Sequence, residues 1–578
     1  MILQALTDYY KALSAEGVLE PMGWSPEKVS FAICLNDDGS IDAINDIRTQ
    51  QLSGKKTVLA ARRLSLPAHT KRAVNIAANF LCDNSAYLLG LDSKGKPERT
   101  KKCYEASKEL HLRLLKDLSS PAAQAVVRFF EAWEPEHAQD VPEVAEHMED
   151  ILSGANLIFE VGGRFVHEDS EIRLVWEREF AAQGDGPQMV CLVTGETGPV
   201  ERLHPAIKNV AGAQSSGASI VSFNAPAFCS YGKEQSFNAP TGKFAAFAYA
   251  AALNHLLTKR ETVFKIGDAT VVFWAKNGRN AYQDIFSGLV FGSAVPSYTA
   301  KELADFMKSL CAGKHVTFEE DMLDPDMDFY VLGLSPNAAR LSVRFFLHNS
   351  FGTFLRSVQA HQERLEIERP SFDARDNLSL WELLDETVNQ NSRDKSPAPN
   401  LAGETLRAIL NDTPYPATLL QGVMLRIRAE RKVSRGRAAI IKAYYLKNNH
   451  PDVPKEVLTV SLNQSSKNVP YVLGRLFAVL EGIQSAANPG INTTIKDKYF
   501  SSASATPAQV FPLLINLAQK HLKKLSAGQR IYYDTQISEL MNLLEDSFPQ
   551  RMNQPMQGAF LLGYYHQIQY RYTKKEDK

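Results

Sequence analysis

The spacing of apolar residues predicts mixed helices and strands over most of the chain and helices alone at its C-terminal end. Residues 2–13 carry apolar side chains at helical spacing, so a first helix is expected there. Most strand signals lie between about 155 and 350. Within this part, 341–348 alternates apolar and polar residues and is expected to pair with a strand at 329–334.

Turn signals place further strands in the first half of the chain. A strand expected at 29–35 ends in the turn Asn36-Asp37-Asp38-Gly39. Two more are expected at 77–81 and 86–91, with Asp83-Asn84-Ser85 as the turn between them. The pair Gly162-Gly163 predicts a hairpin of 156–161 and 164–167. Other strands are expected at 189–194, 219–223 and 269–275, and helices at 101–118, 241–257 and 300–311.

The polar, proline-containing stretch 390–400 is typical of a linker, and strand signals almost vanish beyond it. The expected fold class is therefore α+β, with a mixed α/β N-terminal and central region followed by an all-α helical bundle. We divide the chain into an N-terminal α+β region at 1–120, a central mixed α/β domain at 121–390 and the bundle at 401–578. Helices of the bundle are expected at 403–410, 416–430, 434–448, 470–487, 507–525, 529–545 and 557–572.

The composition is that of an ordinary globular protein, with 44% hydrophobic and 22% charged residues among 578. The chain has no apolar run of about 18 residues, so no transmembrane helix is expected. The N-terminus lacks the basic and apolar regions of a signal peptide, and a cytoplasmic location is expected. The six cysteines never form C-x-x-C, which excludes the common zinc and redox spacings and leaves reduced, mostly buried thiols.

Charge is distributed unevenly although the formal net charge is only -1. Residues 48–116 hold fifteen Lys and Arg against five Asp and Glu, and residues 401–578 hold twenty-three against thirteen. The stretch 117–400 between them holds twenty-four against thirty-nine. Basic segments can follow a phosphate backbone, or they can simply keep a large protein in solution.

The motifs of common enzyme classes are missing from the sequence. Gly242-Lys243 lacks the earlier glycine of a P-loop, and His167-Glu168-Asp169 has no second histidine four positions on. The chain is expected not to be an enzyme, with neither a metal nor a cofactor. The alternative is a metal-dependent nuclease, for which an acidic run would supply the ligands, although such a run is more often a solvated loop. That run contains Asp321, Asp324, Asp326 and Asp328.

Candidate nucleic-acid contacts in the N-terminal part are basic residues and two asparagines. Asn79 and Asn84 can donate and accept hydrogen bonds at base edges, but turn chemistry explains them as well and is the favoured interpretation. Lysines at a helix start oppose the helix dipole, which favours a ligand over stabilisation for Lys101 and Lys102. The basic candidates are Lys55, Lys56, Arg62, Arg63, Lys71, Arg72, Lys101 and Lys102.

A repeated pentapeptide marks a second candidate region. Ser-Phe-Asn-Ala-Pro occurs at 222–226 and again at 236–240, and a polar loop lies between the two copies. Loops after buried strands often carry binding residues, whereas proline-led helix starts explain both copies equally well. The binding candidates are Asn224, Tyr231, Lys233, Gln235 and Asn238.

The third candidate region is basic and helical. Between Arg426 and Lys447 eight basic residues stand against one acidic residue, Glu430, which favours phosphate binding over a solvated face. If one helix runs through the region, four of the basic residues share one face, while Ile440, Ile441, Tyr444 and Tyr445 point to the core. The four are Arg428, Arg431, Lys432 and Arg435; Lys523 and Lys524 belong to a lesser patch.

Four segments together resemble the large subunit of the type I-C CRISPR surveillance (Cascade) complex. They are 1–10, beginning MILQAL; 79–90, NFLCDNSAYLLG; 191–257, with CLVTG, SFNAPAFCSYG, NAP and ALNHLL; and a C-terminal group with IKDKYF, SASATP and GAFLLGY. The resemblance spans the chain in the expected order, although no single segment is a mechanistic motif.

The resemblance implies a function without catalysis. Such a subunit recognises the short flanking motif (the PAM) in duplex DNA, promotes R-loop formation, steadies the displaced strand and recruits the helicase-nuclease. By analogy with other guide-RNA complexes, base pairing reads the rest of the target. The implied partners are guide crRNA, target double-stranded DNA, and the backbone and guide-end-processing Cascade subunits. A small subunit made from the chain's own C-terminal region is implied as well. A purely protein-binding scaffold remains an alternative.

Overall fold

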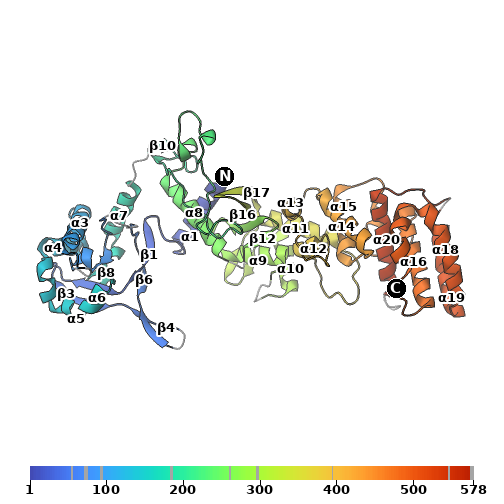
Figure 1. Ribbon diagram of the computed structural model, residues 1–578, viewed down its shortest axis with the longest axis horizontal. Coiled ribbons are helices and arrows are strands. Elements are labelled where there is room, and N and C mark those ends of the chain that lie inside the picture. The colour runs from blue at the N-terminus through green and yellow to red at the C-terminus, as the bar shows by residue number, and fades with distance from the viewer. Residues whose placement is uncertain are drawn as a thin grey trace. The chain divides into compact units, whose positions relative to one another are not determined.

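The computed structural model describes residues 1–53, 56–70, 76–91, 95–182, 187–259, 262–293, 298–393, 395–544 and 547–572. For 51–53, 56–58, 181, 182 and 300 the description is limited to the backbone. The chain forms two compact units, Met1–Pro205 with Val221–Leu253 and Ala206–Ile220 with Asn254–Lys578. The predicted α+β fold class is confirmed (Figure 1). The predicted division at about 120 and 390–400 stays a prediction.

The first unit is built around a small mixed sheet with strand order β3-β2-β8-β7, and β9 pairs with β8. The central strands β2 (Phe31–Leu35) and β8 (Asn156–Val161) run parallel, and most of their side chains are buried. Phe129 and Phe130 of α4 pack on Phe159 of β8 beside the buried His111. The outer strands are β3 (Ile41–Asp46), β7 (Cys82–Asn84) and β9 (Arg164–Phe165).

Two antiparallel ribbons and a set of helices complete the first unit. The first ribbon pairs β1 (Trp24–Val29) with β6 (Arg62–Pro67), and the second pairs β4 (Thr49–Ser53) with β5 (Lys56–Ala60). A short hairpin joins β10 (Gln188–Val190) to β11 (Thr197–Pro199). Its helices include α1 (Ile2–Ala15), α2 (Ser85–Leu88), α3 (Pro97–Leu115), α4 (Pro121–Ala132), α5 (Pro142–Glu146), α6 (Met148–Leu152) and α7 (Ser170–Ala182).

The second unit begins with an antiparallel sheet of order β12-β13-β16-β17. Every residue of β13 (Ala269–Ala275) is buried, as expected for a central strand of apolar residues. The predicted pairing of the last two strands is confirmed, with the turn at Ala338, whose φ is +53°. The other elements of this part are β12 (Phe264–Ile266), β14 (Val316–Phe318), β15 (Asp321–Leu323), β16 (Asp328–Asn337), β17 (Arg340–Ser350), α9 (Asn280–Phe291), α10 (Ala300–Cys311) and α11 (Phe351–Leu365).

Helices α12 to α20 form the C-terminal part of the second unit. They share one continuous core with the sheet, and α16 packs along α20 with its small Gly474 against the Phe560 carbonyl. The predicted C-terminal helices are confirmed to within a few residues, but α17 was not predicted. Their bounds are α12 (Leu380–Asp385), α13 (Pro399–Leu410), α14 (Ala417–Glu430), α15 (Arg435–Asn448), α16 (Val469–Ala487), α17 (Ile495–Ala505), α18 (Pro507–Leu522), α19 (Ala527–Asn542) and α20 (Gln554–Tyr572).

Three of the predicted strands are not formed. The strands predicted at 77–81 and 86–91 are replaced by β7 and the short helix α2, because Asn84 caps that helix rather than turning between strands. The strand predicted at 219–223 is reduced to one bridge between Ser219 and Arg340. The six cysteines are free thiols, and three of them are buried. Among the described helices, none combines the length and the apolar character that crossing a bilayer requires.

Candidate nucleic-acid interface

The β1–β6 ribbon places Lys28 directly opposite Arg63. Both side chains are exposed, and no carboxylate of a described residue lies within ion-pair distance of either. Residues opposite each other on an antiparallel pair project from the same face, and like charges there are destabilising. Among the described residues, the ribbon therefore presents two cations without a carboxylate partner side by side, which is an arrangement suited to a phosphate backbone. Lys28 was missed by sequence reasoning because its partner is distant in the chain.

Arg62 points to the other face of the same ribbon, since successive strand residues alternate in direction. Its guanidinium lies 5.8 Å from the ring centroid of Phe165, and Val29 opposite it is fully buried. Arg62 thus covers apolar surface as well as carrying charge. Although Arg62 and Arg63 are adjacent in sequence, they point to opposite faces of the ribbon and so do not form a joint contact site. Three other basic candidates, Lys55, Lys71 and Arg72, lie outside the described residues, and Lys56 is described only in its backbone.

Lys101 and Lys102 are both exposed on α3. The prediction that they open the helix was wrong, because α3 begins at Pro97 and carries Glu98 in its first turn. The two lysines therefore lie beyond the turn where the helix dipole acts most strongly. They remain candidates because of their exposure, not because of an unfavourable helix position.

Asn79 and Asn84 hold the local backbone together. Asn79 is 6% exposed, and its side-chain oxygen accepts a hydrogen bond of 3.0 Å from the Thr70 amide. The Asn84 side-chain oxygen accepts one of 3.1 Å from the Ala86 amide as the N-cap of α2. The buried Asp83 accepts from the amides of both asparagines. Turn and capping chemistry, the favoured interpretation of the sequence, accounts for both side chains.

The loop between the two Ser-Phe-Asn-Ala-Pro copies is closed by Asn238. Its side-chain oxygen accepts from the Ser230 amide at 2.8 Å, and its side-chain nitrogen donates to the carbonyls of Lys233 and Gln235, both at 2.9 Å. Gln235 in turn accepts from Arg202 at 2.7 Å. Pro226 at the end of the first copy starts a short 3-10 turn, Pro226–Phe228. The second copy overlaps the 3-10 turn Gln235–Asn238, and α8 (Lys243–Thr258) starts after it. The side chains of Asn238 and Gln235 are thus scaffold rather than free contacts.

Tyr231 lies at the tip of this loop with 98% of its surface exposed. Its φ is +53°, and Gly232 and Gln235 also have positive φ values. The left-handed conformation costs a residue with a Cβ about 1–2 kcal/mol, so the loop holds Tyr231 in an unfavourable backbone state. Asn224 and Lys233 are exposed as well. The result is an ordered loop that presents an aromatic ring and a cation to solvent.

The basic C-terminal region is not one helix. Helix α14 ends at Glu430, Arg431 follows in the left-handed conformation with a φ of +53°, and α15 begins at Arg435. The condition for a single basic face, one helix running through the region, is therefore not met, and the two predicted helices on either side of the break are confirmed. Arg428, Arg431 and Lys432 are exposed, and Arg428 donates to Gln557 at 2.8 Å.

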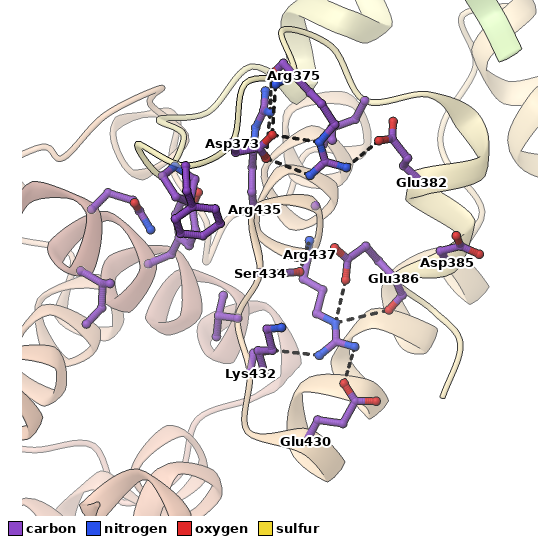
Figure 2. A pocket seen from close by; sticks show the side chains of 18 of the residues that line it. Asp373, Arg375, Glu382, Asp385, Glu386, Glu430, Lys432, Ser434, Arg435 and Arg437 are labelled. Atoms are coloured by element: carbon purple, nitrogen blue, oxygen red, sulfur yellow. Dashed lines mark hydrogen bonds and ion pairs between the residues drawn. The ribbon is translucent and has the colours of Figure 1, made fainter. Parts of the chain in front are cut away.

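Arg435 and Arg437 lie inside two ion clusters (Figure 2). Arg435 is 9% exposed and contacts Asp373 at 3.2 Å, and Arg375 holds the same carboxylate at 2.9 Å. The hydrogen bond from Arg375 is the main reason why the pKa of Asp373 lies well below its usual range. The charge of Arg435 is thus already neutralised by a carboxylate, and Arg435 does not belong with the exposed residues Arg428, Arg431 and Lys432.

Arg437 forms the second cluster at the break between α14 and α15. Its guanidinium contacts Glu430 at 2.6 Å and Glu386 at 3.1 Å, and it donates to the Lys432 carbonyl at 2.9 Å. The two clusters line a cavity of about 1060 Å³ (Figure 2). Glu386 and Asp373 come from outside the basic segment, which is why counting charges along that segment overestimated its free positive charge.

The interior face of α15 follows the sequence prediction more closely. Ile440, Ile441 and Tyr445 are buried and Tyr444 is partly buried, as expected. Lys442 is buried too, and its ammonium donates to the Arg364 carbonyl at 3.0 Å. Burial lowers the pKa of Lys442 to about 8. This lysine is therefore not available to a ligand on the surface.

Lys523 and Lys524 follow the last residue of α18 and are exposed. Cations at a helix C-terminus interact favourably with the helix dipole, which gives both a structural role. Lys524 also donates to the Asn488 side chain at 3.2 Å. Neither role prevents contact with a phosphate.

The acidic run considered for a nuclease is tied to local structure. Asp321 pairs with Arg279 at 3.3 Å, and Asp328 contacts His348 at 2.9 Å and Lys276 at 3.3 Å. The Asp324 carboxylate accepts from the Asp326 amide at 2.8 Å. Within the described ranges, no three His, Cys, Asp or Glu side chains gather as a group that could hold a metal ion.

Comparison with known proteins places this arrangement in a family. The chain matches the family model described as CRISPR-associated protein (Cas_Csd1) over residues 6–572. The comparison with curated proteins finds no match. Because the family match runs through both compact units, from the first helix to the last, the chain belongs to the Cas_Csd1 family of CRISPR-associated proteins and is a subunit of a Cascade complex.

Proposed function

We propose that this chain is the large, non-catalytic, nucleic-acid-binding subunit of a type I-C Cascade complex. It recognises the PAM in duplex DNA and promotes R-loop formation. It also stabilises the displaced strand and recruits the helicase-nuclease. Its partners are guide crRNA, target DNA, the backbone and guide-end-processing subunits, and a small subunit derived from its own C-terminal region.

The observation that carries the proposal is the pair Lys28 and Arg63. A like-charge pair on a solvent-exposed ribbon lowers the stability of the free protein, and a bound ligand of opposite charge would offset that cost. A phosphate backbone supplies such a ligand, and neutralising it releases counterions. The exposed cations Lys101, Lys102, Arg431 and Lys432 provide further positive charge on other parts of the chain.

The test uses the complex assembled with guide RNA and its partner subunits, with and without this chain. Affinity is measured for duplex targets that differ only in the flanking motif, at several salt concentrations. We expect flank discrimination to disappear when the chain is omitted. The log-log salt dependence should become shallower by about 0.9 for each phosphate that is no longer neutralised.

Other outcomes would separate the alternatives. Magnesium-dependent cleavage by the isolated chain would favour a nuclease. Unchanged discrimination and unchanged salt dependence without the chain would reject the PAM-reading role and favour a protein-binding scaffold. Flank discrimination and salt dependence are measured on the same complexes. The stoichiometry of the remaining subunits is checked in each complex, so that an assembly defect is not mistaken for a loss of discrimination.

A further inference from the structure

We propose that Tyr231 stacks on a nucleobase of the target and that the loop 230–238 exists to hold its ring in place. The inference rests on the proposed function and names the ligand chemistry of one site within it. Tyr231 is 98% exposed, more than any other large hydrophobic residue among the described side chains. An aromatic ring so completely in water is explained most simply by a flat apolar partner that covers it in the complex.

The loop restricts the backbone beneath the ring. Asn238 uses both ends of its amide to bind Ser230, Lys233 and Gln235, so both sides of the tip are anchored. A flexible loop would let Tyr231 leave the left-handed region, and the hydrogen bonds to Asn238 oppose that relaxation. Tyrosine also has few rotatable bonds, so the ring loses little conformational entropy when it becomes covered.

The surroundings favour a nucleobase over a protein partner. Lys233, two residues from the ring, is exposed, and Arg202 joins the loop through Gln235. These two cations outweigh the exposed Glu234, the acidic residue of the loop. An aromatic ring beside cations is the usual composition of a surface that binds unpaired bases, because the ring takes the base and the cations take its phosphates.

The experiment uses the assembled complex and target duplexes that carry the fluorescent base 2-aminopurine at one position at a time. The positions cover the flanking motif and the adjacent target bases, and stacking on a ring quenches the fluorescence. Tyr231→Leu removes the ring at similar bulk, and Tyr231→Phe keeps it. Phe372→Leu is the matched control, because Phe372 is 89% exposed on a loop that carries no proposed contact.

We expect one or two positions to be quenched with the wild type and with Tyr231→Phe but not with Tyr231→Leu. Affinity should fall about tenfold with Tyr231→Leu, as for the removal of one base–aromatic stack. The salt dependence should not change, because stacking neutralises no phosphate. Asn238→Ala should weaken the quench while leaving the ring present, which would identify Asn238 as a positioning residue.

Each remaining outcome decides the question. Equal quenching and equal affinity for the wild type and Tyr231→Leu would overturn the stacking proposal and leave the loop as a protein contact. That result would not affect the proposed function if omission of the whole chain still abolished flank discrimination. A reduced affinity with no quench at any position would also overturn stacking, since the ring would then act on something other than a base.

Discussion

Lys28 and Arg63 face each other across the β1–β6 ribbon, although one belongs to the first strand of the chain and the other to the sixth. Both are exposed and project from one face of the ribbon. If the chain binds DNA as proposed, this relationship links stability to function, because two cations that repel each other in the free protein would attract a phosphate backbone.

Removing one cation of this pair should stabilise the free protein and weaken its binding. We expect Lys28→Ala to raise the free energy of unfolding by a few tenths of a kcal/mol, because it removes a cross-strand repulsion. The same change should reduce the log-log salt slope of DNA binding by about 0.9. Chemical denaturation and titrations of the assembled complex at several salt concentrations measure the two effects.

Arg63→Ala should act in the same way. Lys301→Ala is the control, because Lys301 is an exposed lysine of α10 with no proposed contact, and it should leave the slope unchanged. An unchanged salt slope in both ribbon variants would remove Lys28 and Arg63 from the interface.

Two neighbouring arginines should respond differently to mutation. Arg435→Met removes one of the two arginines that contact the buried Asp373 carboxylate, and because Arg375 still pairs with it, we expect a cost of about 1–3 kcal/mol of folding free energy. Arg431→Gln is exposed and should change stability by less than about 0.5 kcal/mol. The salt slope of DNA binding should fall for Arg431→Gln, and urea denaturation should show the destabilisation of Arg435→Met. A destabilisation in Arg431→Gln as large as that of Arg435→Met would contradict this division.

Close packing of α16 on α20 should make Gly474 intolerant of any side chain. A Cβ on Gly474 would lie far inside van der Waals contact of the Phe560 carbonyl, and one on Gly563 would meet the Tyr471 carbonyl. Because backbone cannot yield as a side chain can, Gly474→Ala should cost about 1–3 kcal/mol or more. Thermal unfolding of the full chain measures this cost.

Gly528 offers the opposite case within the same group of helices. It lies in α19, and nothing lies within 4 Å of an added Cβ. Gly528→Ala should therefore raise stability by about 0.5–1 kcal/mol, since alanine loses less backbone entropy in a helix. A Gly474→Ala variant as stable as the wild type would contradict the close α16–α20 contact, whatever the result for Gly528→Ala.

Buried histidine should make the protein less stable in acid. Burial, and then the charge of Arg364, lowers the pKa of His361 to about 3, and its ring contacts the Tyr415 hydroxyl at 2.6 Å. The unfolded chain has the ordinary pKa near 6.5, so it binds more protons between the two values. Above about pH 6.5 this histidine therefore does not reduce the free energy of unfolding. As the pH decreases further, its effect lowers that free energy by up to about 1.4 kcal/mol per pH unit.

The unfolded wild type binds up to one more proton at His361 than the folded protein does. His361→Gln should remove this difference and so weaken the pH dependence of stability. Denaturation at pH 8, where the histidine is neutral in both states, measures the packing cost of the substitution alone. The difference between wild type and variant should then shrink as the pH falls toward 4. Parallel curves for the two proteins at every pH would show that His361 does not contribute.

Much of the secondary structure was predictable because hydrophobic periodicity is a local property. The strand at 269–275 and the helix at 300–311 were predicted with the bounds that the structure has. The wrong predictions fell where a residue suits two local structures, and only tertiary packing selects between them. Asn84 suits a turn and a helix cap equally well, and the tertiary structure selected the cap.

The candidate interface was less predictable than the fold. Its basic residues were identified from composition, but composition cannot tell an exposed cation from a paired one. Arg435 and Arg437 are neutralised by Asp373 and Glu386, which come from the preceding part of the chain. Lys28, by contrast, lies outside the segment with the strongest positive charge and became a candidate only because strand register places it opposite Arg63.

The sequence by itself determined the fold class, the C-terminal helices and the resemblance to a CRISPR-associated family, because these follow from local periodicity and from the order of short segments. Only the tertiary structure decided which charges are free, because that depends on contacts between residues far apart in the chain. It also decided that Asn238 orders a loop and that Tyr231 is exposed at its tip. Hydrogen bonds and burial are properties of the packed chain, and no single segment carries them alone.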